Sequence, residues 1–212
     1  MISLGSTDIT LSRMGLGTWA IGGGPAWNGD LDLQICIDTI VEAHRCGINL
    51  IDTAPGYNFG NSEVIVGQAL KKLPRSEVVV ETKCGIVWER TGSLFNKVGD
   101  RQLYKNLTPE SIREEVDASL QRLGIDSIDI YMTHWQSVEP CFTPIAETVD
   151  TLNTLKKEGK IRSIGAANVD AGHIREYLKH GELDIIQAKY SILDRALEAD
   201  LLPLCQQNGI IV

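Results

Sequence analysis

Short apolar segments alternate with amphipathic segments along most of the chain. A short apolar run between turn residues is typical of a buried strand, whereas apolar residues every three or four positions are typical of a helix. The first element predicted is a hairpin, two short segments around the turn Gly5-Ser6-Thr7-Asp8. Strands are then predicted within MGLGTWA, INLID, EVVVETK, SIDIYMTH, IRSIGAAN and LDIIQAKY, and the final IIV resembles the opening of a seventh strand.

The amphipathic segments carry signals for where helices begin and end. In the clearest case Thr108 is a predicted N-cap, Pro109 suits the first helical position, and Gly124 suits the residue that stops the helix. Asp170 and Gly181 predict the start and end of a later helix in the same way. Other helices are predicted near residues 30–46, 62–72, 145–158 and 197–208. A long loop is predicted between the third strand and the helix at Thr108.

Strands that alternate with helices imply a parallel sheet with right-handed crossovers. Two α/β architectures fit this pattern, an open doubly wound sheet and a (β/α)8 barrel. In both, functional residues gather at the carboxyl ends of the strands. Asp52, Lys83 and His134 stand at three such ends, so we expect them to share one site.

Composition narrows the class of protein. The 212 residues carry a net charge of -8 without a block of like charge, which argues against a nucleic-acid or anionic-membrane partner. Neither a signal peptide nor an apolar run of membrane-spanning length is visible. The 5 cysteines form no CxxC pair and the 4 histidines form no HExxH motif. These features predict reduced thiols, a cytoplasmic location and no metal site.

The segment GLGTWA matches the dinucleotide fingerprint G-x-G-x-x-G/A, which requires a helix to begin at the motif. Here Gly22, Gly23, Gly24 and Pro25 follow at once. No helix start tolerates such a run, and the sequence therefore argues against a Rossmann domain.

Tyr57 follows Asp52 across a Pro-Gly turn and could act as an acid if Lys83 lay beside it. An ammonium within about 4 Å, at an effective dielectric constant near 20, favours the phenolate by roughly 4 kcal/mol. Before desolvation opposes it, this attraction lowers the pKa of the phenol from about 10 by up to about three. We therefore predict Tyr57 as a general acid poised near neutral pH.

The other members of this group receive complementary roles. Asp52 is the predicted partner of the buried Lys83 charge, and His134 is predicted to orient a substrate carbonyl or to help move the proton. Taken singly, each residue has a structural explanation, as a turn residue, a packed aromatic, a snorkelling lysine or a core imidazole. Their joint placement favours an active site.

The chain resembles the aldo-keto reductase family over its whole length. The resemblance lies in GLGTW, NLIDTAPGYNFGNSE, VVVETKCG, IDIYMTHW, IGAAN and IIQAKYSIL, which occur in the family's order and at its strand positions. It implies an α/β fold, the (β/α)8 TIM barrel with an N-terminal β-hairpin, and NADH or NADPH bound without a Rossmann domain. Because family members continue further, we expect residues 1–212 to be a single barrel domain with about six βα units, truncated in strand 7.

The resemblance also implies roles for individual residues. Tyr57 becomes the proton donor, Lys83 its pKa modulator, Asp52 the residue that orients Lys83, and His134 the substrate-orienting partner. The residues matching the cofactor site are Gly17, Thr18, Trp19, Asp52, Asn168 and Gln187, and the expected walls of the substrate pocket are Trp27, Trp88 and Trp135. One departure is Ala167, where the family commonly has a serine that bonds the nicotinamide, a loss of about 1 kcal/mol.

The first functional hypothesis is an NAD(P)H-dependent oxidoreductase that reduces small aldehydes or 2-oxoaldehydes, such as methylglyoxal, to alcohols, with tyrosine as general acid. Its expected partner is a small-molecule carbonyl substrate. The alternative is a non-catalytic cofactor-binding or scaffold subunit of the same fold. The sequence leaves open the oligomeric state and the physiological substrate, which pocket loops rather than the fold decide. It also leaves open the choice between NADH and NADPH, because in the family the selecting region lies beyond the residue that matches Val212.

Overall fold

The computed structural model describes residues 1–5, 7–27, 29 and 31–212, and a curved parallel sheet runs through them. Within these residues the sheet has 6 strands in the order β11-β10-β9-β5-β4-β3. Its strands are β3 (Gly15–Gly17), β4 (Leu50–Asp52), β5 (Val79–Cys84), β9 (Ile128–Thr133), β10 (Ile161–Ala167) and β11 (Ile185–Gln187). The order follows the chain without reversal, which is the winding of a half-barrel rather than of a doubly wound sheet.

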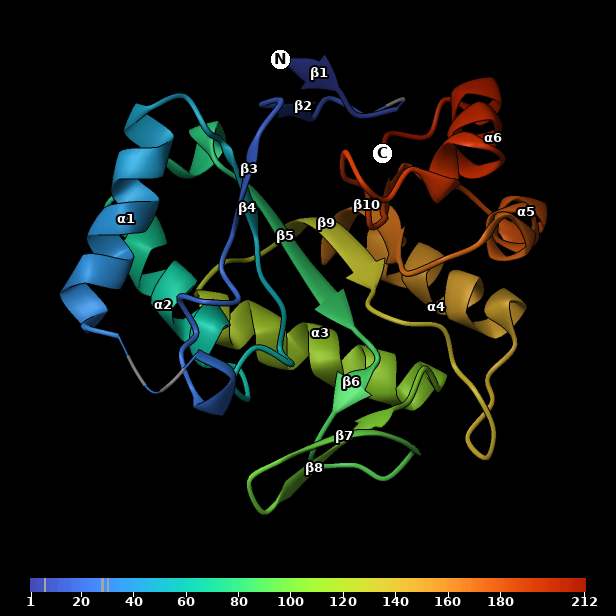
Figure 1. The fold of residues 1–212 in the computed structure, drawn as a ribbon, viewed down its shortest axis with the longest axis horizontal. Helices are drawn as coiled ribbons and strands as arrows, with labels where there is room; N and C mark the ends of the chain where they lie inside the picture. Colours follow the sequence, from blue (N-terminus) through green and yellow to red (C-terminus); the bar gives the residue numbers. More distant parts are fainter. Residues whose placement is uncertain (6, 28, 30) are drawn as a thin grey trace.

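The helices cover the outer face of the sheet, and Figure 1 shows them passing from α1 and α2 through α3 to α4 and α5. They are α1 (Leu33–Arg45), α2 (Asn61–Leu70), α3 (Pro109–Leu123), α4 (Ile145–Lys157), α5 (Ala171–His180) and α6 (Leu201–Asn208). The predicted end of α3 at Gly124 is confirmed, because this glycine is the C-cap and its backbone is in the left-handed conformation. Asp170 is likewise confirmed as a cap. Residue 30, where the first helix was predicted to begin, lies outside the described residues.

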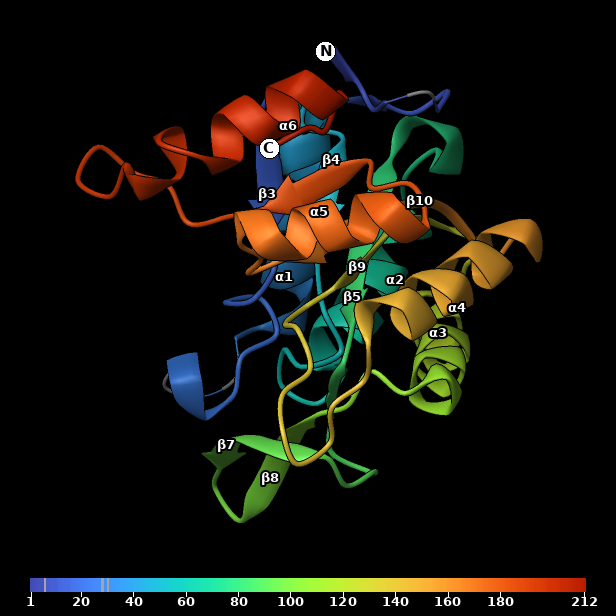
Figure 2. The same cartoon turned by 90° about the vertical axis from the view of Figure 1, so that its right-hand side faces the viewer.

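The predicted N-terminal hairpin is confirmed by antiparallel pairing of β1 (Ile2–Ser3) with β2 (Thr10–Leu11). Ser6 of its predicted turn lies outside the described residues. Figure 1 and Figure 2 both place this hairpin at the amino ends of the strands, opposite β7 and β8. Its buried leucines and isoleucine pack on inward-facing side chains of the sheet in one apolar cluster, so the hairpin closes that end of the half-barrel.

The long loop predicted after the third strand is wrong, because this segment forms an antiparallel sheet. Its strands are β6 (Ile86–Val87), β7 (Ser93–Val98) and β8 (Arg101–Lys105). A β-bulge between Leu94 and Asn96 shifts the register, so apolar and polar residues do not alternate regularly. The segment therefore lacks the period-two pattern by which strands are predicted.

Successive residues of β5 point to opposite sides of the sheet, and this alternation places Glu81 and Lys83 on its inner face. Val80 and Cys84 belong to the apolar cluster under the helices, whereas Val79 belongs to the cluster inside the half-barrel. Glu81 and Lys83 share the side of Val79 because they follow it at two-residue intervals. The carboxyl end of the inner face is therefore charged, and its amino end is apolar.

The described residues include neither a helix suited to cross a membrane nor a cluster suited to bind a metal ion. No helix among them combines the length and the apolar character required to cross a bilayer. Among the same residues, no group of three or more histidine, cysteine, aspartate or glutamate side chains could hold a metal ion.

Candidate active site

Lys83 stands at the centre of the polar group on the inner face. Its side chain is fully buried, and Nζ donates hydrogen bonds to Asp52 Oδ1, to Thr53 O at 3.0 Å and to Tyr57 Oη at 3.4 Å. These contacts use all three N–H groups of the ammonium. Burial is the largest single influence and lowers the pKa of Lys83, but the charges of Asp52, Tyr57 and Glu81, with the hydrogen bond to Asp52, together outweigh it and leave the pKa above its ordinary value. The site therefore contains a permanent buried cation.

Tyr57 is held on a tight loop between β4 and α2. Asn58 and Phe59, the next two residues, have φ angles of 51° and 54°, a left-handed conformation that non-glycine residues adopt infrequently. Asn58 Nδ2 donates to Gly22 O at 2.9 Å, which ties the loop to the segment after β3. The Tyr57 ring lies 5.8 Å from the His134 ring and 6.2 Å from that of Trp19, centroid to centroid. The loop thus directs the phenol between Lys83 and the imidazole.

Buried hydroxyl groups fix the start of this loop. Thr18 Oγ1 donates to the backbone oxygen of Asp52 at 2.9 Å and contacts Ser62 Oγ at 2.7 Å. Thr53 Oγ1 donates to the same serine oxygen at 2.9 Å. Thr18 is fully buried, so in this structure its side chain supports the loop that carries Tyr57.

The predicted near-neutral pKa of Tyr57 is wrong. Burial is the largest influence and raises the pKa, Lys83 lowers it, and Asp52 and Glu81 raise it again, with a net rise above the ordinary value. The prediction from the sequence included the attraction to Lys83 but neither the extent of burial nor the charges of Asp52 and Glu81. At neutral pH the free protein therefore holds Tyr57 as a protonated phenol, which can donate a hydrogen bond and a proton.

His134 follows β9 and is kept neutral by its surroundings. Burial, and secondarily the charge of Lys83, lower the pKa of its imidazole to about 3. Its buried Nδ1 has no hydrogen-bond partner among the described residues. The backbone is fixed on both sides, because His134 N donates to Cys84 O at 2.9 Å and Asn168 Nδ2 donates to His134 O at 2.8 Å. A neutral, firmly positioned imidazole suits a role in orienting a carbonyl group.

A cavity of about 370 Å³ opens beside these groups. Tyr57, His134 and Asn168 contribute polar atoms to its wall, and Trp19 and Trp135 contribute aromatic surface. The remaining walls come largely from the loop after β3 and from the antiparallel sheet of β6, β7 and β8: Gly23, Pro25, Ala26, Ile86, Phe95, Asn96, Val98 and Leu103. This volume is in the range of small-molecule sites, and such mostly apolar pockets bind through a few convergent polar groups.

Sequence reasoning missed the wall that β7 and β8 provide. Phe95 lies 5.8 Å from the Trp135 ring, centroid to centroid, and Lys105 lies over the same indole at 4.7 Å. The signal that could have revealed the hairpin is the Gly99-Asp100 turn between two short segments of mixed polarity.

The structure separates the three predicted tryptophan walls. Trp135 lines the cavity, whereas Trp27 lies outside its lining and packs edge-on against Trp19 at 5.2 Å. Trp88 packs against Phe59 at 5.6 Å and lines a different cavity. Only Trp135 of these three is therefore placed to touch a ligand beside Tyr57, and substrate contact itself stays a prediction.

The predicted cofactor residues lie at the ends of adjacent strands. Asn168 N donates to Gln187 O at 3.1 Å, which brings the two amide-bearing residues together at the ends of β10 and β11. Gln187 Nε2 donates to Asp52 Oδ2 at 3.2 Å. Gly17 pairs with Asp52 in the parallel register, and a Cβ on it would lie 3.9 Å from that same Oδ2. These two primary amides, in contact with Asp52 and His134, match the donors and acceptors of a carboxamide, so they fit the nicotinamide end of a cofactor.

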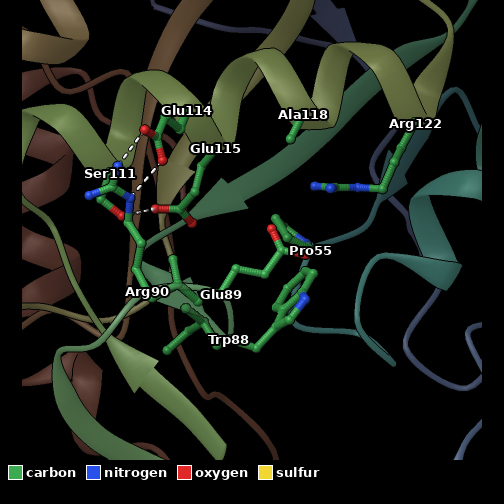
Figure 3. A pocket seen from close by; sticks show the side chains of 11 residues that line it. Pro55, Trp88, Glu89, Arg90, Ser111, Glu114, Glu115, Ala118 and Arg122 are labelled. Atoms are coloured by element: carbon green, nitrogen blue, oxygen red, sulfur yellow. Dashed lines mark hydrogen bonds and ion pairs between the residues drawn. The ribbon is translucent and has the colours of Figure 1, made fainter.

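A second cavity, of about 80 Å³, lies between α3 and the segment around β6, and Figure 3 shows the side chains that line it. Glu114 and Glu115 project from α3 beside Arg90 and Ser111. Glu115 is buried and accepts hydrogen bonds from Gly85 N at 2.8 Å and from Ser111 Oγ at 3.1 Å. The carboxyl group thereby anchors the chain just beyond Lys83, and burial raises its pKa to about 8.

The buried carboxyl group of Glu115 should make the unfolding free energy depend on pH. Its folded pKa of about 8 lies above the ordinary value near 4.3, so the folded state retains a proton that the unfolded state loses. This contribution is complete below about pH 4 and declines as the pH rises through about 8. We expect Glu115→Gln to flatten the fall in unfolding free energy over that interval, measured by urea denaturation. Glu114→Gln, which changes an exposed partner of Arg90, is the control, and equal slopes in the wild type and Glu115→Gln would contradict the prediction.

Comparison with curated proteins gives a consistent family. The model of the Aldo/keto reductase family matches residues 13–212. An NADH-specific methylglyoxal reductase from Escherichia coli (strain K12) is 88% identical over 211 residues, covering 100% of this chain and 65% of that protein. The aldo-keto reductase YhdN from Bacillus subtilis (strain 168) is 40% identical over 209 residues, covering 98% of this chain and 59% of that protein.

Solved structures agree with the fold described above. A glycerol dehydrogenase, AKR11B4 from Gluconobacter oxydans, superposes with a TM-score of 0.86 at 35% identity, covering 100% of this chain and 62% of that one. The holo form of the aldo-keto reductase AKR11C1 from Bacillus halodurans gives 0.82 at 33% identity, covering 100% and 64%. The chain thus spans less than two thirds of the length of these relatives.

Proposed function

The chain belongs to the aldo/keto reductase family, and we propose that it carries the catalytic residues of an NADH-dependent reductase of small aldehydes or 2-oxoaldehydes. The observation that carries the proposal is the contact of Lys83 Nζ with Tyr57 Oη at 3.4 Å, beside a cavity that also exposes a neutral His134. A phenol and an imidazole that line one cavity, with a buried cation in contact with the phenol, are the groups that proton delivery to a carbonyl oxygen requires.

We also propose that the described strands form part of a (β/α)8 barrel and that residues 1–212 belong to a single domain. The strand order without reversal supports this, as does the N-terminal hairpin packed under the inner face. So does the likeness to the glycerol dehydrogenase from Gluconobacter oxydans. In such a barrel the active site lies at the carboxyl ends of the strands, where Asp52 and Lys83 stand.

The reaction assigned to these residues is the protonation of a carbonyl oxygen. Tyr57 and His134 would hold that oxygen by hydrogen bonds at the cavity wall, and Tyr57 would give up its phenolic proton as negative charge develops there. The ammonium of Lys83 would stabilise the resulting phenolate, and Asp52 keeps the ammonium in place. When bound, NADH supplies the hydride for the carbonyl carbon. Asn168 and Gln187 would hold its carboxamide.

The preference for NADH is proposed from the name of the relative from Escherichia coli. We expect the full-length protein to oxidise NADH in the presence of methylglyoxal, with a higher kcat/KM for NADH than for NADPH. The loss of reduced-nicotinamide absorbance measures both rates. Equal efficiency with both cofactors would contradict the preference. Absence of oxidation with methylglyoxal and with a panel of small aldehydes would contradict the reductase itself.

The alternative of a non-catalytic subunit is not favoured, because the four predicted catalytic side chains form one connected group: Tyr57 and His134 line the cavity, and Lys83 joins Tyr57 to Asp52. A scaffold has no need of a buried lysine in contact with a phenol. The cytoplasmic location stays a prediction from the sequence.

A further inference from the structure

Glu81 is a buried acid in the active site for which the mechanism above has no role. It lies on β5 two residues before Lys83 and pairs with Asp52 in the parallel register of β4. Its Oε1 is 3.9 Å from Lys83 Nζ and 3.4 Å from Gln187 Nε2. Its side chain is 3% exposed. A second carboxyl group therefore lies next to the ion pair of Asp52 and Lys83.

The charges of this cluster balance only if one carboxyl group keeps a proton. Asp52, Glu81 and Lys83 would carry a net negative charge if both acids were ionised, and burying an uncompensated charge is costly. Asp52 makes the direct contact with the ammonium and is 16% exposed, whereas Glu81 is more distant from Nζ and more deeply buried. The proton therefore belongs on Glu81, whose pKa is raised to about 8, first by burial and further by Asp52, against the opposing pull of Lys83.

The groups that face Glu81 define what its ionisation would change. β4 contributes Asp52, and the loop after it contributes Tyr57. β5 contributes Lys83, while β9 presents the apolar Ile130 in register with Glu81. From β11, Gln187 donates its amide and does not titrate. Tyr57 is thus the reactive group that senses the charge of Glu81.

We propose that Glu81 is a positioning residue that stores a proton beside Asp52 and Lys83, and that loss of this proton weakens Tyr57 as an acid. The inference rests on the proposed reductase function. An ionised Glu81 places a second negative charge near Lys83 and Tyr57 and raises the pKa of Tyr57, which makes proton donation harder. Carbonyl reduction should therefore decline on the alkaline side as Glu81 ionises, near pH 8.

The pH profile of Glu81→Gln tests this role in the full-length protein. Glutamine has the shape of a protonated glutamate and cannot lose the proton, so the decline in kcat for methylglyoxal reduction near pH 8 should disappear in the variant. Glu115→Gln is the matched control, because Glu115 is also buried with a pKa of about 8 and lies outside the active-site cavity. It should retain the alkaline decline. The same decline in Glu81→Gln as in the wild type would overturn the proposal.

Two spectroscopic readouts separate this inference from the reductase function. The infrared band of a protonated carboxyl group should be present in the wild type at neutral pH and reduced in Glu81→Gln. The titration of Tyr57, taken as the tyrosinate absorbance of each protein minus that of its Tyr57→Phe counterpart, should shift about one pH unit lower in Glu81→Gln. An unchanged band or an unchanged titration overturns the role of Glu81. Both expected changes in a protein that reduces no carbonyl compound would support the stored proton and overturn the reductase function.

Discussion

Replacing Tyr57 with phenylalanine is expected to lower turnover in carbonyl reduction by about 10²-fold or more. The variant keeps an aromatic ring against Trp19 and His134 and loses only the hydroxyl that contacts Lys83 at 3.4 Å. No other described hydroxyl contacts that ammonium. Turnover would be measured with saturating NADH and methylglyoxal in the full-length protein.

Tyr104→Phe is the matched control for this experiment. Tyr104 lies on β8, its hydroxyl contacts Gln102, and it does not line the cavity. We expect this variant to turn over at the wild-type rate. Near wild-type turnover in Tyr57→Phe would remove Tyr57 from its role as proton donor.

Replacing Lys83 with methionine is expected to damage both stability and activity. The ammonium is fully buried and bonded to Asp52, and removing one partner of a buried ion pair costs about 3–5 kcal/mol of unfolding free energy. Turnover should also fall by about 10²-fold or more, because Tyr57 loses the charge that stabilises its phenolate. Urea denaturation and steady-state kinetics measure the two effects.

A double variant separates these two effects. Asp52→Asn combined with Lys83→Met removes both charges, so it should recover much of the lost stability while turnover stays low. Lys160→Met, which breaks an exposed pair with Asp117, should cost no more than about 1 kcal/mol. A Lys83→Met protein as stable as the wild type would contradict the buried ion pair.

The sequence predicts those parts of the fold that depend on local patterns. Helix α3 was predicted correctly because its cap, its first-turn proline and its terminal glycine act on their own neighbours. The antiparallel sheet was missed because a bulge at Leu94 and Asn96 disturbs its alternation. Phe95 and Leu103 of this sheet line the cavity, and no sequence motif predicts that they do.

The candidate site was predictable where topology alone decides it. Asp52, Lys83 and His134 could be grouped because the carboxyl ends of parallel strands meet at one edge. The upward shift of the Tyr57 pKa could not be predicted, since it depends on burial and on the carboxyl groups of Asp52 and Glu81. Glu81 did carry a signal, a charged residue at the two-residue spacing that puts it on the same face as Lys83.

The central claim is that the Tyr57 phenol, beside the Lys83 cation, delivers the proton during carbonyl reduction. Slow product release can mask the chemical step in steady-state turnover, so a single-turnover measurement tests this claim most directly. Full-length wild type and Tyr57→Phe, each loaded with NADH, would be mixed rapidly with methylglyoxal, and the affinity for NADH would be measured separately. We expect equal NADH affinity and a chemical step about 10²-fold or more slower in the variant. A Tyr57→Phe protein that oxidises its bound NADH at the wild-type rate would contradict the claim.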